Sequence, residues 1–182
     1  MRFNSSRTVC SLVLLIFCFW AVCLHGQTLK VLHNFGGSGD GSDPFMGLII
    51  DPQGNLYGVT YQGGGSGNEG VAFQLVPNAD GSWTEKVLHS FGSYPDSNLV
   101  TELALDAKGE LYGGTSDAGA SGSLFELVPG SNGKWSEVVR SASIPSPSGV
   151  TLDSAANLYA TSTDGGPRGY NGMFVTTSRT GV

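Results

Sequence analysis

Three aspartates recur at matching places in the sequence, and their carboxylates are the first candidates for chemistry. Asp51, Asp106 and Asp153 each open a short word that ends in Leu-Tyr. Carboxylate oxygens are the ligands that hard divalent cations such as Ca²⁺ prefer, so a ring of them could hold a metal. An Asp at the start of a tight turn also accepts hydrogen bonds from the backbone that follows it. We therefore predict a turn role for the three residues, with a metal site as the alternative.

Two histidines also occupy matching places. His33 and His89 lie in the words Val-Leu-His-Asn-Phe-Gly and Val-Leu-His-Ser-Phe-Gly. In a strand, Val31 and Phe35 would share a face with His33 because side chains alternate between the two sides. This neighbourhood favours a packed or edge histidine over a general base or a metal ligand.

Three further patterns suggest chemistry but have simpler explanations. Gly65–Gly70 matches the G-x-G-x-x-G dinucleotide fingerprint, yet a strand is predicted after it in place of the helix that a pyrophosphate requires. Asp40 and Asp43 offer carboxylates at a spacing that fits no Ca²⁺ loop. An aromatic set at repeat spacing is typical of a core between repeats, with a glycan-stacking surface as the alternative. Its members are Tyr57, Tyr112, Tyr159, Trp83 and Trp135. We assign no catalytic, cofactor-binding or metal-binding residue.

The composition excludes several classes of protein. The 182 residues include 28 Gly and are 40% hydrophobic but only 13% charged, with a net charge of −6. An acidic chain is a poor candidate for binding nucleic acid. Its apolar content separates it from the highly charged disordered proteins. Many turns that join short strands are the architecture that this composition favours.

The beginning of the chain has the pattern of a secretory signal peptide. Arg2 and Arg7 precede an uncharged apolar run at residues 9–24, which is shorter than the ~20 residues of a membrane-spanning helix. We predict cleavage after Gly26 and a protein that is exported to the periplasm or secreted, with no membrane attachment. The three cysteines lie at positions 10, 18 and 23, so the mature chain would contain no disulfide and no thiolate site.

The remainder of the chain is repetitive. The Asp-led word starts at residues 51, 106 and 153, and words of the types Phe-x-Leu-Val-Pro and Trp-x-Glu recur in the same order. Each word has the pattern of a strand, and the Asp-led words contain tight turns. We therefore predict an all-β domain at residues 27–182, with repeats that start near 46, 99 and 148. Helix is expected only in the signal segment.

The unit is four short antiparallel strands in about 50 residues, which is the size of a β-propeller blade. The predicted strands are 28–35, 46–50, 55–61, 71–77, 83–91, 99–105, 110–115, 123–128, 134–141, 148–152, 157–162 and 172–177. They make a propeller-like array of about three blades. The strand at 28–35 corresponds to an outermost strand, and we expect it to complete the third blade and close the ring.

These words resemble the GloVer-type tandem repeat family of exported bacterial proteins. The match is carried by Val-Leu-His-x-Phe-Gly, by Gly-Leu-Ile-Ile-Asp-x-x-Gly-Asn-Leu-Tyr-Gly and by Val-Ala-Phe-x-Leu-Val-Pro. The hairpin is also loosely similar to the blades of NHL-type and lactonase-like propellers. The resemblance implies an exported repeat protein for which no catalytic activity is established. We expect a non-enzymatic binding or scaffolding module that acts through its Gly-rich loops.

The sequence allows more than one assembly and more than one function. Propellers have about four to eight blades, so three blades indicate a piece of a longer protein, a homodimer that completes a six-bladed ring, or an open fan. The alternative function is a lactonase-like hydrolase or lyase with a divalent cation held by Asp side chains. The partner in either case would be an extracellular ligand or protein that the sequence does not identify.

Overall fold

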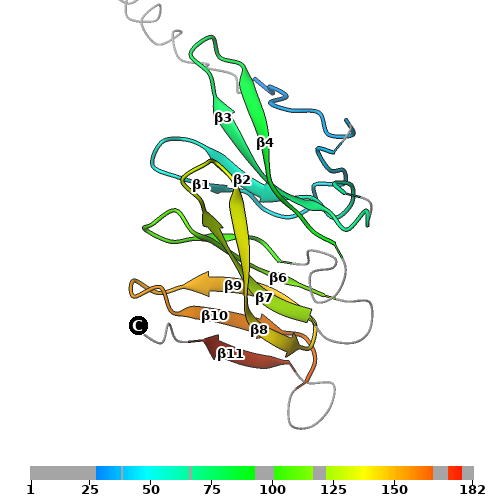
Figure 1. The fold of residues 1–182 in the computed structure, drawn as a ribbon, viewed down its shortest axis with the longest axis vertical. Coiled ribbons are helices and arrows are strands. Elements are labelled where there is room, and N and C mark those ends of the chain that lie inside the picture. Colours follow the sequence, from blue (N-terminus) through cyan, green and yellow to red (C-terminus); the bar gives the residue numbers. More distant parts are fainter. Residues whose placement is uncertain are drawn as a thin grey trace, which may run out of the picture. The chain divides into compact units, whose positions relative to one another are not determined.

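The structure, a computed structural model, describes residues 28–37, 39–65, 67–92, 101–116, 122–165 and 172–177. The chain divides into two units, Met1–Val31 and Leu32–Val182, and all the strands lie in the second. Figure 1 shows that the described elements are strands, and none of the described residues is in a helix. Consequently, this part of the chain contains no helix that could span a membrane.

The strands form three antiparallel sheets, each built from one repeat. The first sheet has the order β1 (Ile49–Ile50), β2 (Leu56–Val59), β3 (Val71–Pro77) and β4 (Trp83–Ser90). The second has the order β5 (Ala104–Leu105), β6 (Leu111–Thr115), β7 (Gly122–Pro129) and β8 (Trp135–Ile144). The third has three strands, β9 (Pro147–Leu152), β10 (Leu158–Ser162) and β11 (Met173–Thr177), with β10 in the middle. Eleven of the twelve predicted strands are therefore present.

The Asp-led turns join the first two strands of each sheet. In the first sheet the Gly54 amide donates to the Asp51 carbonyl at 3.0 Å, and the Asp51 amide donates to the Asn55 carbonyl at 3.0 Å. Gly54 has φ 85°, a value that suits glycine because it has no Cβ. The equivalent position in the third sheet is Ala156, which adopts φ 59° with a side chain present.

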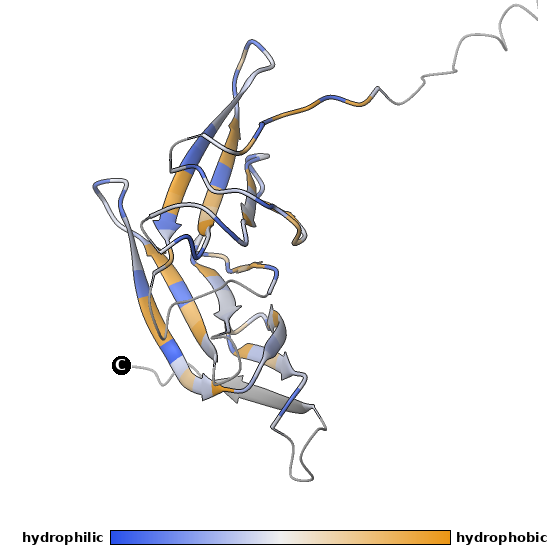
Figure 2. Ribbon diagram, turned by 90° about the vertical axis from the view of Figure 1, so that its right-hand side faces the viewer, coloured by the Kyte–Doolittle hydropathy of each residue, from blue (hydrophilic) through white to orange (hydrophobic). Residues whose placement is uncertain are grey.

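Apolar residues pack between neighbouring sheets. Figure 2 shows hydrophobic and hydrophilic stretches following one another along the longer strands. One cluster joins the first and second sheets through Tyr57, Val59, Ala72, Phe91, Leu103, Leu111, Phe125 and Leu127. Another joins the second and third sheets through Tyr112, Leu124, Ile144, Leu158 and Ala160. The second sheet therefore lies between the other two.

One predicted strand is wrong. Residues 28–35 do not form a strand, and the third sheet has three strands where four were expected. Leu32 and Phe35 instead pack against the buried residues Val71, Phe73 and Leu75 of the first sheet. The physical reason is that an apolar face of the first sheet is available to these side chains within the same compact unit. The segment predicted to be a signal peptide and residues 99–100 lie outside the described residues.

Candidate functional site

The Asp51 carboxylate is fully engaged within its own turn. Oδ1 accepts hydrogen bonds from the backbone amides of Gln53 and Asn55, both at 2.9 Å. Oδ2 accepts from the Asn55 side chain at 2.7 Å and from the Tyr57 hydroxyl at 3.0 Å. Burial raises the pKa of Asp51, but these hydrogen bonds outweigh it and lower the pKa overall. Burial, together with the Asp51 carboxylate, raises the pKa of Tyr57.

The turn of the third sheet repeats this arrangement. The Asp153 carboxylate accepts from the amides of Ala155 and Asn157 at 2.9 Å, from the Asn157 side chain at 2.7 Å and from the Tyr159 hydroxyl at 3.0 Å. The hydrogen bonds from Asn157 are the main cause of the lowered pKa of Asp153. The turns at Asp51 and Asp153 thus use the same four kinds of donor: two backbone amides, an asparagine side chain and a tyrosine hydroxyl.

The turn of the second sheet differs because Glu110 replaces the asparagine. Asp106 Oδ1 accepts from the amides of Lys108 and Glu110, both at 2.9 Å. The Tyr112 hydroxyl contacts Glu110 Oε2 at 3.3 Å and donates to Glu126 Oε1 at 2.9 Å. The Glu126 side chain is buried and forms an ion pair with Arg140. In the first sheet Gln74 occupies the place of Glu126, and its amide donates to the Tyr57 hydroxyl at 2.8 Å.

The three aspartates line two neighbouring cavities. Asp51 and Asp106 border one of about 320 Å³, and Asp106 and Asp153 border another of about 590 Å³. Each cavity therefore has two of the three carboxylates at its border. Among the described residues, no group of three His, Cys, Asp or Glu side chains is arranged to hold a metal ion.

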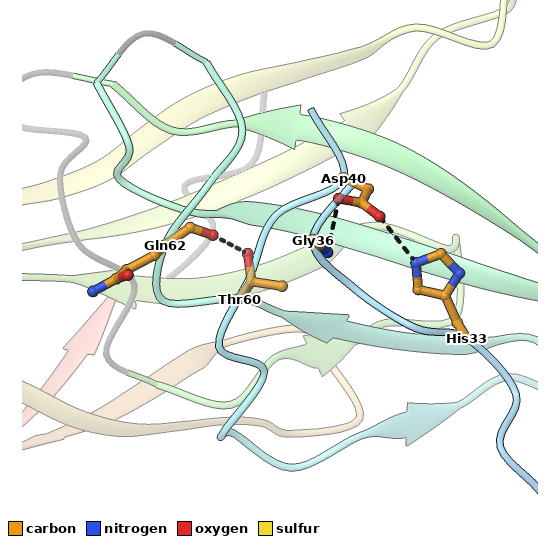
Figure 3. Close-up of polar contacts among 5 residues, drawn as sticks. All are labelled: His33, Gly36, Asp40, Thr60 and Gln62. Atoms are coloured by element: carbon orange, nitrogen blue, oxygen red, sulfur yellow. Dashed lines mark hydrogen bonds and ion pairs between the residues drawn. The ribbon is translucent and has the colours of Figure 1, made fainter. Parts of the chain in front are cut away.

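The two histidines have the same kind of aromatic neighbour. The His33 ring meets Phe35 edge to face at 4.6 Å, and the His89 ring meets Phe91 at 4.7 Å. Each histidine also faces a carboxylate. His33 Nε2 lies 3.3 Å from Asp40 Oδ2, whereas His89 Nε2 lies 3.7 Å from Glu137 Oε2. Figure 3 shows His33 with Asp40, whose other oxygen accepts from the Gly36 amide at 3.3 Å.

Burial raises the pKa of Glu85, which is the equivalent of Glu137 in the first sheet. The proton on His33, when present, opposes that shift, and the Asp40 carboxylate adds to it. His33, Asp40 and Glu85 thus form a small electrostatic group on the first sheet. The sequence offers Asp40 as a candidate Ca²⁺ ligand, whereas in the structure its partner is His33.

The Gly-rich loop between β2 and β3 is held in place by its own hydrogen bonds. Ser42 and Gln62 exchange backbone hydrogen bonds at 2.7 and 3.1 Å, which ties the loop to the chain that leads into β1. The Thr60 hydroxyl donates to the Gln62 carbonyl at 2.9 Å (Figure 3), and the Asn68 side chain accepts from the Gly63 amide at 3.0 Å. Strand β3 follows this loop directly. The G-x-G-x-x-G pattern therefore lacks the helix that a dinucleotide site needs.

Gly63 shows why this loop requires glycine. It has φ 86°, and a Cβ placed on it would lie 2.5 Å from the Gly41 Cα atom. Two backbones approach at this point more closely than a side chain allows. The corresponding loops of the second and third sheets fall largely outside the described residues.

An aromatic pair lies beside this loop, with Phe45 exposed and Tyr61 half-buried. The Phe45 ring meets the Tyr61 ring edge to face at 5.7 Å, and Phe45 is 59% exposed. Asp43 and Gln62, on the two connected backbone segments, are also exposed. The combination offers an apolar ring edge together with carboxylate and amide groups, which can contact a ligand that has both apolar and hydrogen-bonding surfaces.

The repeated words of the sequence do not include this pair. Tyr61 belongs to none of the recurring words, and its equivalents in the other repeats are Ser116 and Thr163. The difference between the repeats at this position is the feature that identifies the pair in the sequence. An aromatic residue present in only one repeat is not required by the packing that all the repeats share. We define the Phe45 surface as Asp43, Phe45, Tyr61 and Gln62.

Comparison with known proteins gives one family match and a distant structural likeness. Residues 18–182 match the model of the Gloeobacter/Verrucomicrobia repeat. A solved structure provisionally designated a gluconolactonase aligns with a TM-score of 0.45 and 17% identity, over 76% of this chain and 52% of that protein. The chain thus spans about half the length of that structure. No protein of curated function matches the sequence.

Proposed function

The chain belongs to the Gloeobacter/Verrucomicrobia repeat family, and we propose that it is an exported binding module whose Phe45 surface contacts the ligand. The observation that carries the proposal is the paired hydrogen bonding of Ser42 with Gln62, which fixes two exposed segments relative to each other. A surface that is already ordered loses less conformational entropy when a ligand binds. In this proposal the Gly-rich loop holds the surface in position, and the Phe45 ring contacts the ligand.

The chemistry of the surface favours a neutral ligand with an apolar face, of which an oligosaccharide is the model. The Phe45 ring supplies an apolar contact, while Gln62 and Asp43 can bind hydroxyl groups. A chain with net charge −6 repels anionic ligands, which argues against phosphorylated or sulfated ligands. Export is part of the proposal and is supported by the signal-like segment at residues 1–26.

The test compares Phe45→Ala with Val138→Ala by calorimetric titration against a panel of neutral oligosaccharides. Val138 is a matched control because it is also an exposed apolar side chain, but it lies on the outer strand β8. Phe45→Ala should weaken binding at least tenfold with an unchanged melting temperature, since the side chain is largely exposed. Equal affinity for the two variants, or binding to no member of the panel, would count against the proposal.

The alternative function, a lactonase-like hydrolase with a divalent cation, would have to use Asp51, Asp106 and Asp153. Asp51 and Asp153 each accept four hydrogen bonds within their own turns, so a cation would have to displace donors that are already bound. A melting curve with Ca²⁺ or with a chelator separates the two functions. A melting temperature that rises by several degrees on adding Ca²⁺, together with hydrolysis of a lactone, would favour the enzyme over the binding module.

A further inference from the structure

The first sheet has an apolar face that is prepared for a neighbouring sheet. In the second sheet, Leu103 is 4% exposed because it packs against the first sheet. Its repeat equivalent in the first sheet is Leu48, which is 54% exposed. Ile50, two residues further along the chain, is 66% exposed. We define the leading face of the first sheet as the residues that match the buried side of the second. They are Leu48, Ile50, Leu56, Phe73, Leu75 and Trp83. Phe73 and Leu75 are already buried beneath Leu32 and Phe35, so the open part of the face is at Leu48 and Ile50.

The packing within the leading face already matches that of the buried equivalent. A Cβ on Gly58 would meet Leu48 at 2.6 Å and Phe73 at 2.7 Å, so these two side chains meet over the glycine. Leu103 and Phe125 meet over Gly113 in the same way in the second sheet. An open apolar cavity of about 210 Å³ lies on the leading face. The side chains therefore have the arrangement of an interface that lacks its second half.

Phe35 shows which element belongs on this face. Its ring packs on Phe73 with centroids 4.8 Å apart at 60°, and Phe91 packs on Phe125 at 5.1 Å and 56°. Phe91 directly follows β4, the outer strand of the preceding sheet. Phe35 thus lies where the end of a preceding sheet's outer strand would lie, although its own chain supplies no such sheet before it among the described residues.

The third sheet carries the complementary defect. Its order is β11-β10-β9, and no described strand pairs with the outer edge of β11. In the first two sheets that edge is covered by β4 and β8, with Phe73 opposite Val87 and Phe125 opposite Val139. The repeat equivalence places Phe174 opposite Val31. Among the described residues, the third sheet thus has no outer strand, while residues 28–35 have the sequence of an outer strand but pair with no sheet.

We propose that a second copy of this chain covers the leading face. In this dimer the third sheet of each copy packs on the leading face of the other copy. Residues 28–35 of each copy then add to β11 of the other as its fourth strand, as in β-augmentation. The two contacts are identical by two-fold symmetry, so the assembly closes with six sheets and leaves no apolar face open. The dimer is independent of the Phe45 surface and would stand if ligand binding failed.

Closure of one chain and assembly of three copies both account for fewer of these observations. Closure of a single chain would bury Leu48 and Ile50, which are exposed. Three copies would give nine sheets, more than the four to eight that are typical of propellers. A dimer also satisfies the defects at both ends of the array with one kind of contact.

The first test measures the mass of the purified protein by light scattering over a range of concentrations. We expect twice the mass of one chain. The double variant Leu48→Asp/Ile50→Asp should dissociate the dimer at least tenfold more readily, because it places charges in an apolar interface. The control Val138→Asp/Val139→Asp changes two exposed residues on β8 and should leave the dimer intact. A cooperatively melting monomer at all concentrations, an open-ended oligomer, or a dimer unaffected by the first double variant would overturn the proposal.

The second test fixes the register with engineered cysteines in a chain whose Cys10, Cys18 and Cys23 are replaced by Ser. Val31→Cys with Phe174→Cys should form a disulfide between chains, seen as a dimer band without reductant. Phe73→Cys with Val87→Cys is the matched control, because these residues are paired within the first sheet and should link within one chain. A link between positions 31 and 174 within a single chain, or no link while the control forms, would contradict the strand exchange.

Discussion

The first and second sheets have almost the same apolar residues at equivalent positions, yet those residues have different surroundings. Leu103 is buried in the contact with the first sheet, while Leu48 faces solvent. Phe73 and Phe125 are both buried, but Phe73 is covered in part by Leu32 and Phe35, which belong to the segment before the sheet. Each repeat therefore contributes one half of an interface between sheets. How deeply that half is buried depends on which segment of the chain packs against it.

The largest effect is expected where this comparison is sharpest. Leu103→Ala should lower the free energy of unfolding by about 2–5 kcal/mol, because it opens a cavity between two sheets. Leu48→Ala should cost less than about 0.5 kcal/mol in the monomer, since that side chain is exposed. Urea denaturation of both variants measures the difference. If the two losses are equal at low protein concentration, the leading face is not open in the monomer.

A second effect tests whether the Asp-led turns are equivalent. Gly109 has φ 82°, and Ala156 has φ 59° at the matching place in the third sheet. Gly109→Ala should destabilise by about 1 kcal/mol, because a Cβ is unfavourable at positive φ. Ala156→Gly should stabilise by about 0.5 kcal/mol, since relief of that strain exceeds the added flexibility of the unfolded chain. Thermal melts of the two variants should therefore move in opposite directions, and shifts in the same direction would show that the turns differ.

The smallest effect is the pH dependence of the turn carboxylates. The pKa of Asp51 is lowered in the folded protein, so its charged form contributes stability above its unfolded pKa near 3.8. That contribution is lost as the pH falls below about 4 and through the folded pKa. Asp51→Asn should be less stable at pH 7 than the natural protein and should approach its stability near pH 2. Melting temperatures from pH 7 to pH 2 measure this convergence, and a constant difference would remove Asp51 from the acid transition.

The strands could be predicted from the sequence because the residues of each repeated word favour a turn or a strand through local contacts alone. The Asp-led turn is one example, since an Asp that accepts from the next amides and a Gly at positive φ define it without distant contacts. The role of Glu110 in the second turn was not predicted. It depends on Tyr112 and Glu126, which come together only after β6 and β7 have paired.

The segment at residues 28–35 shows the limit of local patterns. Its sequence matches β4, but strand structure requires an edge with which to pair, and the first sheet offers Leu32 and Phe35 an apolar face instead. The Phe45 surface was missed for the opposite reason, because it lies outside the repeated words. A pattern of repeats predicts the structure that the copies share. It does not predict the role of residues that occur in only one copy.

The passage from β8 to β9 has a mechanical consequence. Only Pro145 and Ser146 separate these strands, and the Ser146 side chain donates to Asp164 at 2.8 Å while its carbonyl accepts from the Thr163 amide at 3.0 Å. A pull on this link is transmitted at once to the strands on both sides, since there is no slack to extend. The second and third sheets should therefore yield together when the chain is stretched, as one force-bearing unit.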